Sequence, residues 1–423
     1  IDYFFQVRDN DALNGYKAAK SAIYTYKLKT KEEIEEKYKD VSASLKTGMD
    51  RTMEQALKLQ SKIKDLKERL IAKKEFAWAD KKALEQIKKD QAALKEQLEQ
   101  LLKEKESINR QQQSIGEKND AIKEKEALLE EMLKSLVNEE VEEMMEKIEG
   151  LMEKLNKEDL VKEMDMMSQQ NENTSDELDR LKELYKQLEF EYQYDEAIND
   201  LEDLAKEQKA LAKQKESEMN NEALAKKQED LDKGLDQFSK KMDELEKLNK
   251  EMEKPSESFQ KNEKEQEAIK SEQQQTQESL SKGKRKKAQE SQQKAGEQME
   301  DLAQQMQQQQ QQMQQEQTAI DYETLRQILD NVLSLSFDQE DLLKVAESIN
   351  RNSPNYRKVV LEQYEIKDNL QIIEDSLKSI SKRVIQIKSF VNEELGKLNT
   401  ALDYALNGFE QLKFNRALTN QQY

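Results

Sequence analysis

Apolar residues recur once per helical turn over most of this chain, and that periodicity limits what it can fold into. The clearest run lies between residues 373 and 402, where apolar positions are separated by about 3.6 residues, the period of an α-helix. Its members are Ile373, Leu377, Ile380, Val384, Ile387, Val391, Leu395, Leu398 and Leu402. Polar residues fill the positions between them, so such a helix has one apolar stripe and needs a partner helix to cover it.

The composition favours the same kind of structure. Charged residues make up 38% of the 423 residues and hydrophobic residues 35%, with only two prolines and nine glycines. This balance is typical of long helices and coiled coils. We therefore predict an all-α fold of long antiparallel helical hairpins and coiled coils, with a C-terminal helical bundle and a short N-terminal β-hairpin.

Residues 1–29 differ from the rest, because β-type residues alternate with polar ones over 2–7 and again over 22–28. A lone hairpin is marginally stable in water. We therefore predict that these are the last strands of a β-sandwich-like domain whose earlier strands lie upstream. The polar stretch between the two runs contains Asp9, Asp11 and Asn14. Their oxygens suit calcium, but the spaced ligands and closing glutamate of an EF-hand are missing, and a simple polar turn is the competing interpretation.

Residues 30–118 predict an antiparallel helical hairpin. One apolar stripe covers 34–70 and a heptad pattern interrupted by polar residues covers 84–108. Phe76 and Trp78 lie between the two patterns, and we expect them to plug the turn.

Residues 119–174 predict short helices with a methionine-rich face that ends in a polar loop at 169–175. Methionine is flexible and suits adaptable contact surfaces, although such a stripe is also common in a core. The candidate partner-binding residues on this face are Met132, Met144, Met145, Met152, Met164 and Met167.

Residues 175–254 predict long coiled-coil helices. Gln228 and Asn249 occupy polar positions in their heptad seam. An asparagine at such a position can fix register and partner number, so Asn249 is a further partner-binding candidate. The next segment, 255–287, is of low complexity, and we expect it to be partly disordered or loosely helical.

Residues 288–423 predict the C-terminal helical bundle. The segment 336–339 has the residues of a capping box that would restart a helix at Ser336. Ser353-Pro354 predicts a second restart. The stretch 320–418 should therefore fold as three helices joined by two short corners.

Several kinds of chemistry are excluded or disfavoured. The chain has no histidine and no cysteine, which removes the usual general base and the Ser-His and Cys-His nucleophile pairs. No phosphate-binding glycine loop is present. We predict no enzyme activity, no catalytic residues and no cofactor. A net charge of −19 argues against nucleic-acid binding, and no run approaches the roughly 18 apolar residues of a membrane span.

Several segments resemble a large uncharacterised family of Bacteroidota envelope proteins. They are residues 3–11, 78–82, 186–191, 325–331, 335–342 and 373–377, and the pattern around 325–342 is the most specific. The resemblance implies N-terminal membrane helices, extracytoplasmic β-sandwich-like domains and a long helical region. It also implies that this chain is a C-terminal fragment, held at the periplasmic face of the bacterial inner membrane by segments outside it.

These observations favour a non-enzymatic scaffold that contacts other envelope proteins and can also form a homo-oligomer. The alternative is a holdase-like chaperone or an accessory subunit of a secretion or envelope-biogenesis machine.

Overall fold

The computed structural model describes most of the chain. The described residues are 2–8, 18–25, 31–72, 78–112, 120–137, 140–154, 157–215, 219–349, 355–387, 390–411 and 413–422. Within them are eleven helices: α1 (Lys31–Ala72), α2 (Trp78–Gln112), α3 (Asp120–Ser135), α4 (Glu140–Glu153), α5 (Lys157–Ala212), α6 (Asn221–Glu251), α7 (Glu263–Ser281), α8 (Arg285–Ser348), α9 (Tyr356–Ser381), α10 (Phe390–Glu410) and α11 (Phe414–Gln422). The predicted all-α class is confirmed.

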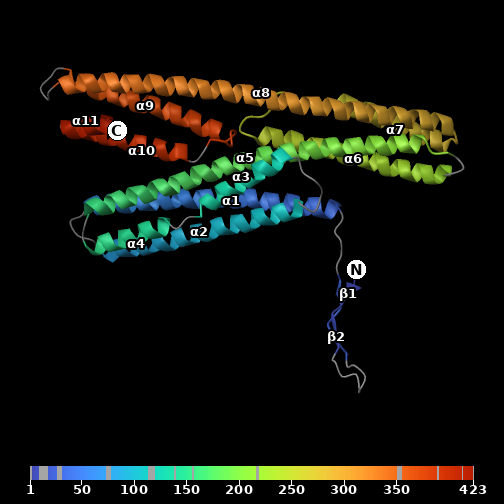
Figure 1. Cartoon of the computed structure of the whole chain (residues 1–423), viewed down its shortest axis with the longest axis horizontal. Coiled ribbons are helices and arrows are strands. Elements are labelled where there is room, and N and C mark those ends of the chain that lie inside the picture. The colour runs from blue at the N-terminus through green and yellow to red at the C-terminus, as the bar shows by residue number, and fades with distance from the viewer. Residues whose placement is uncertain are drawn as a thin grey trace.

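Four short strands precede the helices and project away from them (Figure 1). β1 (Asp2–Tyr3) pairs antiparallel with β4 (Tyr24–Thr25), and β2 (Gln6–Arg8) pairs antiparallel with β3 (Ala18–Lys20). The hairpin is therefore present, and β3 begins a few residues before the second predicted run at 22–28. The calcium candidates Asp9, Asp11 and Asn14 lie outside the described residues.

The helices form three bundles that share two long helices. The first bundle contains α1, α2, α3, α4 and the N-terminal half of α5, with α1 and α2 forming the expected helical hairpin. The second bundle contains the C-terminal half of α5 with α6, α7 and the N-terminal half of α8. The third bundle contains the C-terminal half of α8 with α9, α10 and α11. At 1.5 Å per residue, α5 and α8 are about 84 and 96 Å long, so each can pass through two bundles.

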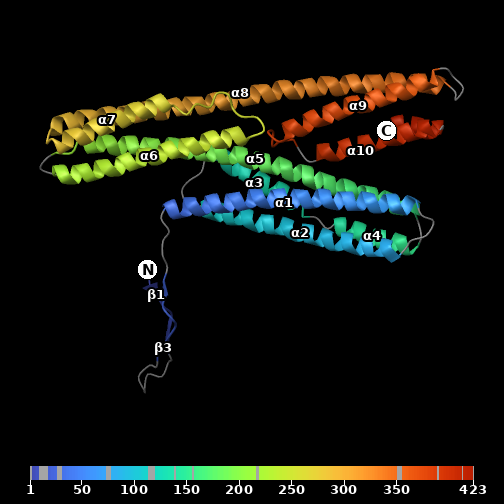
Figure 2. The ribbon, with the colours of Figure 1, turned by 180° about the vertical axis from the view of Figure 1, so that it is seen from behind.

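The first and third bundles lie side by side at one end of the molecule, and the second bundle occupies the other end (Figures 1 and 2). α5 connects the first bundle to the second, and α8 connects the second bundle to the third. The first and third bundles are thus two arms that extend from a common base.

Two predicted helix breaks are wrong, because the residues concerned lie within continuous helices. The loop expected at 169–175 is part of α5, where Asn171 and Thr174 hydrogen-bond to the carbonyls of Met167 and Gln170 one turn earlier. Both side chains therefore bond to backbone carbonyls inside the helix, and neither caps a helix end. The restart expected at Ser336 is also absent, because α8 continues to Ser348.

Three further predictions need correction. The segment expected to be partly disordered contains the regular helix α7, with Ile269 fully buried against the second bundle. Trp78 does not plug the turn of the α1–α2 hairpin, since its side chain is 76% exposed. The apolar stripe between 373 and 402 belongs to two helices: α9 ends at Ser381 and α10 begins at Phe390.

A candidate partner-binding groove and the junction beside it

An apolar groove of about 680 Å³ runs along the third bundle between α8, α9 and α10. Leucine, isoleucine and valine side chains form most of its surface. The apolar lining residues are Val332, Leu335, Leu343, Ile366, Leu370, Ile373, Leu377, Val391, Leu395, Leu398, Ala401 and Leu402. The volume lies within the usual range for binding pockets, about 300–1,000 Å³.

The groove begins where α11 ends. This nine-residue helix packs closely on α10, because a Cβ atom at Gly408 would lie only 2.8 Å from the backbone nitrogen of Ala417. Its last residues, Asn420, Gln421 and Gln422, form one end of the groove. The third bundle therefore has three long helices and a fourth position that α11 fills only in part.

Amide side chains close this end of the groove. Gln339 of α8 and Gln363 of α9 each donate a hydrogen bond to the other, over 3.3 and 2.8 Å. Gln421 of α11 donates to the same Gln363 oxygen over 2.6 Å. Because these bonds link three helices, they fix the depth and position of the end wall.

The rims of the groove carry negative charge. Glu340 on α8 and Glu394 on α10 line it from opposite helices, and their side chains are 61% and 63% exposed. Each pairs with a lysine on its own helix, Lys344 over 3.4 Å and Lys397 over 2.8 Å. A ligand with an apolar surface and basic edges would match this arrangement.

A buried arginine fixes the other end of the third bundle to α5. Arg180 of α5 donates hydrogen bonds to the backbone carbonyls of Ser381, Ile385 and Ile387, which lie at the end of α9 and in the following turn. Its guanidinium also pairs with Glu177 over 2.8 Å, and both side chains are at most 5% exposed. Carbonyls at a helix C-terminus favour a cation, so Arg180 holds the α9–α10 turn against α5.

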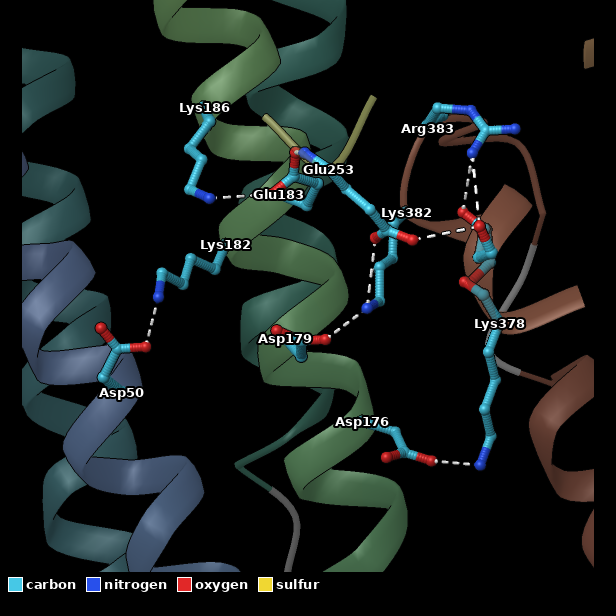
Figure 3. A network of polar contacts seen from close by, with 12 residues as sticks. Asp50, Asp176, Asp179, Lys182, Glu183, Lys186, Glu253, Lys378, Lys382 and Arg383 are labelled. Atoms are coloured by element: carbon cyan, nitrogen blue, oxygen red, sulfur yellow. Dashed lines mark hydrogen bonds and ion pairs between the residues drawn. The ribbon is translucent and has the colours of Figure 1, made fainter. Parts of the chain in front are cut away.

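Further charged contacts surround this turn and make it a junction between all three bundles (Figure 3). Lys382 pairs with Asp179 of α5 over 2.6 Å and with Glu253, which follows α6, over 3.2 Å. Lys378 pairs with Asp176 over 2.8 Å. Arg383 reaches Asp321 of α8 over 3.2 Å, and this ion pair is nearly buried.

The protonation equilibria of these groups reflect burial and pairing. Burial raises the pKa of Glu177 above its ordinary value, although Arg180 partly offsets this. Burial alone lowers the pKa of Lys378, but hydrogen bonds to Asp176 and Glu374 raise it overall. The pKa of Lys382 rises in the same way, through Asp179 and Glu253. Both lysines therefore remain charged at neutral pH.

The methionine candidates lie inside the first bundle. Met145, Met152, Met164 and Met167 are buried in the core that α4 and α5 form with the α1–α2 hairpin, and Met144 packs partly buried against that core. Met132 is partly buried against the neighbouring core. The side chains of these residues face other helices of the same chain.

Asn249 also uses its side chain within the chain. Its amide donates to the carbonyl of Ser256 over 3.1 Å and accepts from the backbone nitrogen of Ser256 over 2.9 Å. It therefore closes the turn after α6.

Sequence reasoning missed both the groove and Arg180. Arg180 is the only arginine between Arg110 and Arg285, in a segment rich in lysine. Arginine can bind several acceptors in one plane, so its isolation among lysines was a usable signal. The sequence gives no such signal for the groove, because its apolar residues have the same helical spacing as ordinary core residues of three helices.

Neither a metal site nor a membrane span is found in the part of the chain that the structure describes. There, acidic residues do not gather in groups of three or more that could hold a metal ion. No described helix combines the length and apolar character needed to cross a bilayer.

Comparisons with protein-family models, curated proteins and solved structures find no match to this chain.

Proposed function

We propose that this chain is a non-enzymatic scaffold whose third bundle binds an amphipathic helix of a partner protein. The observation that carries the proposal is the apolar groove that continues from the end of α11. Its walls span residues 332–343 of α8 and 391–402 of α10, a length of about 17 Å, or three helical turns. A helix that lays its apolar face in such a groove is a common mode of peptide recognition.

The charges on the rims specify the partner further. Glu340 and Glu394 stand on either side of the groove, in a chain of net charge −19. An occupant with lysine or arginine beside its apolar stripe would gain favourable contacts on both edges and would be attracted at a distance.

The resemblance to Bacteroidota envelope proteins supports a location at the periplasmic face of the inner membrane, with other envelope proteins as partners. The absence of histidine and cysteine supports a role without catalysis. Within this proposal the second bundle is the base from which both arms extend, and the third bundle is the arm that binds.

A synthetic helical peptide of leucine and lysine, about 14 residues long, tests the groove. Leu398 lines the groove and is 39% exposed, whereas Leu361 of α9 is 54% exposed and does not line it. Leu398→Lys should weaken peptide binding by about tenfold or more, because it removes apolar contact and places a positive charge beside the lysines of the peptide. Leu361→Lys should leave the affinity unchanged. Isothermal titration calorimetry measures both.

A photo-crosslinking amino acid at the same two positions extends the test to the cell. Position 398 should capture one protein reproducibly, through a segment that forms a basic amphipathic helix, and position 361 should not. Failure of the peptide to bind, or equal effects of the two leucine substitutions, would refute the groove as the binding site.

A further inference from the structure

The outer face of α8 in the third bundle carries a second apolar stripe that no described residue covers. Tyr322, Leu329, Leu333 and Phe337 are 70%, 58%, 49% and 63% exposed. At about 100° per residue they fall within a sector of roughly 80°. Ile328, Leu335 and Leu342, which face the core, lie roughly 140–180° from the centre of that sector. This part of α8 is thus apolar on two opposite sides, as expected for a helix covered from both.

The stripe is confined to the third bundle. About two to four turns before Tyr322, the same side of α8 carries Gln308, Gln311 and Gln315, all exposed. A polar surface of that kind is typical of a helix face that is exposed to water. The change to tyrosine, leucine and phenylalanine after residue 321 therefore marks a local contact surface.

The residues along this stripe are arranged symmetrically about Leu333. Leu329 and Phe337 lie four residues before and after it, Arg326 and Glu340 seven, and Tyr322 and Lys344 eleven. If two α8 helices crossed antiparallel with a twofold axis at Leu333, each residue would face its counterpart in the other copy. Leucine would meet phenylalanine, arginine would meet glutamate and lysine would meet a tyrosine ring, which are all favourable pairs.

We propose that this face of α8 binds a second copy of the chain in that antiparallel arrangement. The contact is isologous, so it closes as a dimer and leaves no repeated surface for further growth. The helices would overlap over about 318–348, or roughly 45 Å. The N-terminal half of each α8 would extend past the end of the other, which keeps the two second bundles apart. The surface shares only Glu340 with the rim of the groove. Substitutions at Arg326 therefore test the dimer alone, substitutions at Leu398 test the groove alone, and the two proposals can fail independently.

Arg326 and Glu340 cannot pair with each other within one chain. Arg326 pairs with Glu323 over 2.9 Å, and Glu340 pairs with Lys344 over 3.4 Å, all of them exposed. Arg326 and Glu340 are 14 residues apart on one helix, about 21 Å, which is too far for an ion pair. Any coupling between these two positions must therefore come from contact between two copies.

Charge reversal provides the decisive experiment, followed by analytical ultracentrifugation of the 423-residue chain over a concentration series that reaches the millimolar range. The unaltered chain should dimerise. Arg326→Glu and Glu340→Arg should each raise the dimer dissociation constant by about tenfold or more, because each places like charges opposite each other twice. The double variant should dimerise again, and an equimolar mixture of the two single variants should form a heterodimer. Asp338→Arg, an exposed reversal on another side of α8, should have no effect.

Cysteine cross-linking tests the register, since the chain has no cysteine of its own. Leu333→Cys should form a disulfide with itself under mild oxidation, and Asp338→Cys should not. Leu329→Cys and Phe337→Cys should cross-link when mixed. A chain that remains monomeric throughout, or a dimer that the single reversals leave unchanged, would overturn the proposal; unchanged circular dichroism melting curves show that the variants are folded.

Discussion

At the scale of single residues, Arg180 contributes most clearly to the position of the third bundle. Its guanidinium is buried, pairs with Glu177 and donates to three carbonyls of the α9–α10 turn. An exposed ion pair on a helix surface contributes little to stability. A buried cation differs, because its removal leaves both a buried carboxylate and several acceptors without partners.

We predict that Arg180→Met lowers the free energy of unfolding by about 3–5 kcal/mol, the usual cost of removing one member of a buried ion pair. Adding Glu177→Met should recover part of this loss, because no unpaired charge then remains. Lys206→Met, which removes an exposed cation from the same helix, should leave the melting temperature unchanged. Chemical denaturation followed by circular dichroism measures all three, and an Arg180 variant as stable as the Lys206 variant would contradict the prediction.

At the scale of helices, the sequence predicts periodic segments well and predicts their ends poorly. The apolar stripes over 34–70 and 84–108 correspond to α1 and α2. Residues 169–175 look like a loop because Asn171 and Thr174 favour caps and turns, yet they lie within α5. There the neighbouring helices supply packing that exceeds the local preference, since helix propensity is a weak term compared with tertiary burial. The break between α9 and α10 is the opposite case: apolar spacing continues through it, and only the contacts of Arg180 show why the chain turns.

Helix register in the second bundle depends on a buried layer of glutamines. Gln208 of α5, Gln228 of α6 and Gln292 of α8 are all fully buried. Gln208 and Gln228 exchange hydrogen bonds of 2.9 and 3.2 Å, and Gln292 donates to Gln228 over 3.1 Å. The polar seam position recognised at Gln228 therefore acts between helices of one chain, where the sequence alone could not distinguish it from a contact between chains.

Gln228→Leu should lower the free energy of unfolding by about 1–3 kcal/mol, because Gln208 and Gln292 lose the partner that they share. Replacing all three glutamines by leucine should restore or increase stability, since an apolar layer has no unpaired groups. The triple variant should also lose helix register, with broadened methyl signals from the second bundle in NMR spectra. A triple variant less stable than Gln228→Leu would show that the layer contributes through packing rather than through hydrogen bonds.

At the scale of the whole molecule, polar contacts predominate where the two arms meet. The cleft between the first and third bundles has a volume of about 690 Å³ and is lined largely by charged and amide side chains, among them Lys67, Glu172 and Asp403. α10 approaches α5 closely at only one described glycine, Gly396, where a Cβ atom would meet the amide of Gln169. Contacts of this kind respond to salt and charge more than apolar packing does, so we expect the angle between the arms to be adjustable while each bundle remains folded.

Reversal of the charges at the junction should therefore open the arms. Lys378→Glu together with Lys382→Glu would place carboxylates against Asp176, Asp179 and Glu253, which the two lysines contact in the native chain. Because the chain lacks cysteine, spin labels at Glu68→Cys in α1 and Thr400→Cys in α10 can report the separation of the arms by double electron–electron resonance.

The reversed variant should give a longer and broader distance distribution, and high salt should shift the unaltered chain in the same direction. Lys358→Glu reverses an exposed lysine of α9 that pairs only along its own helix among the contacts described, and it serves as the matched control. If the distribution stayed the same in the reversed variant and in high salt, Arg180 and the apolar contacts beside it would suffice to fix the third bundle. The groove would then present its partner at a constant angle to the first bundle.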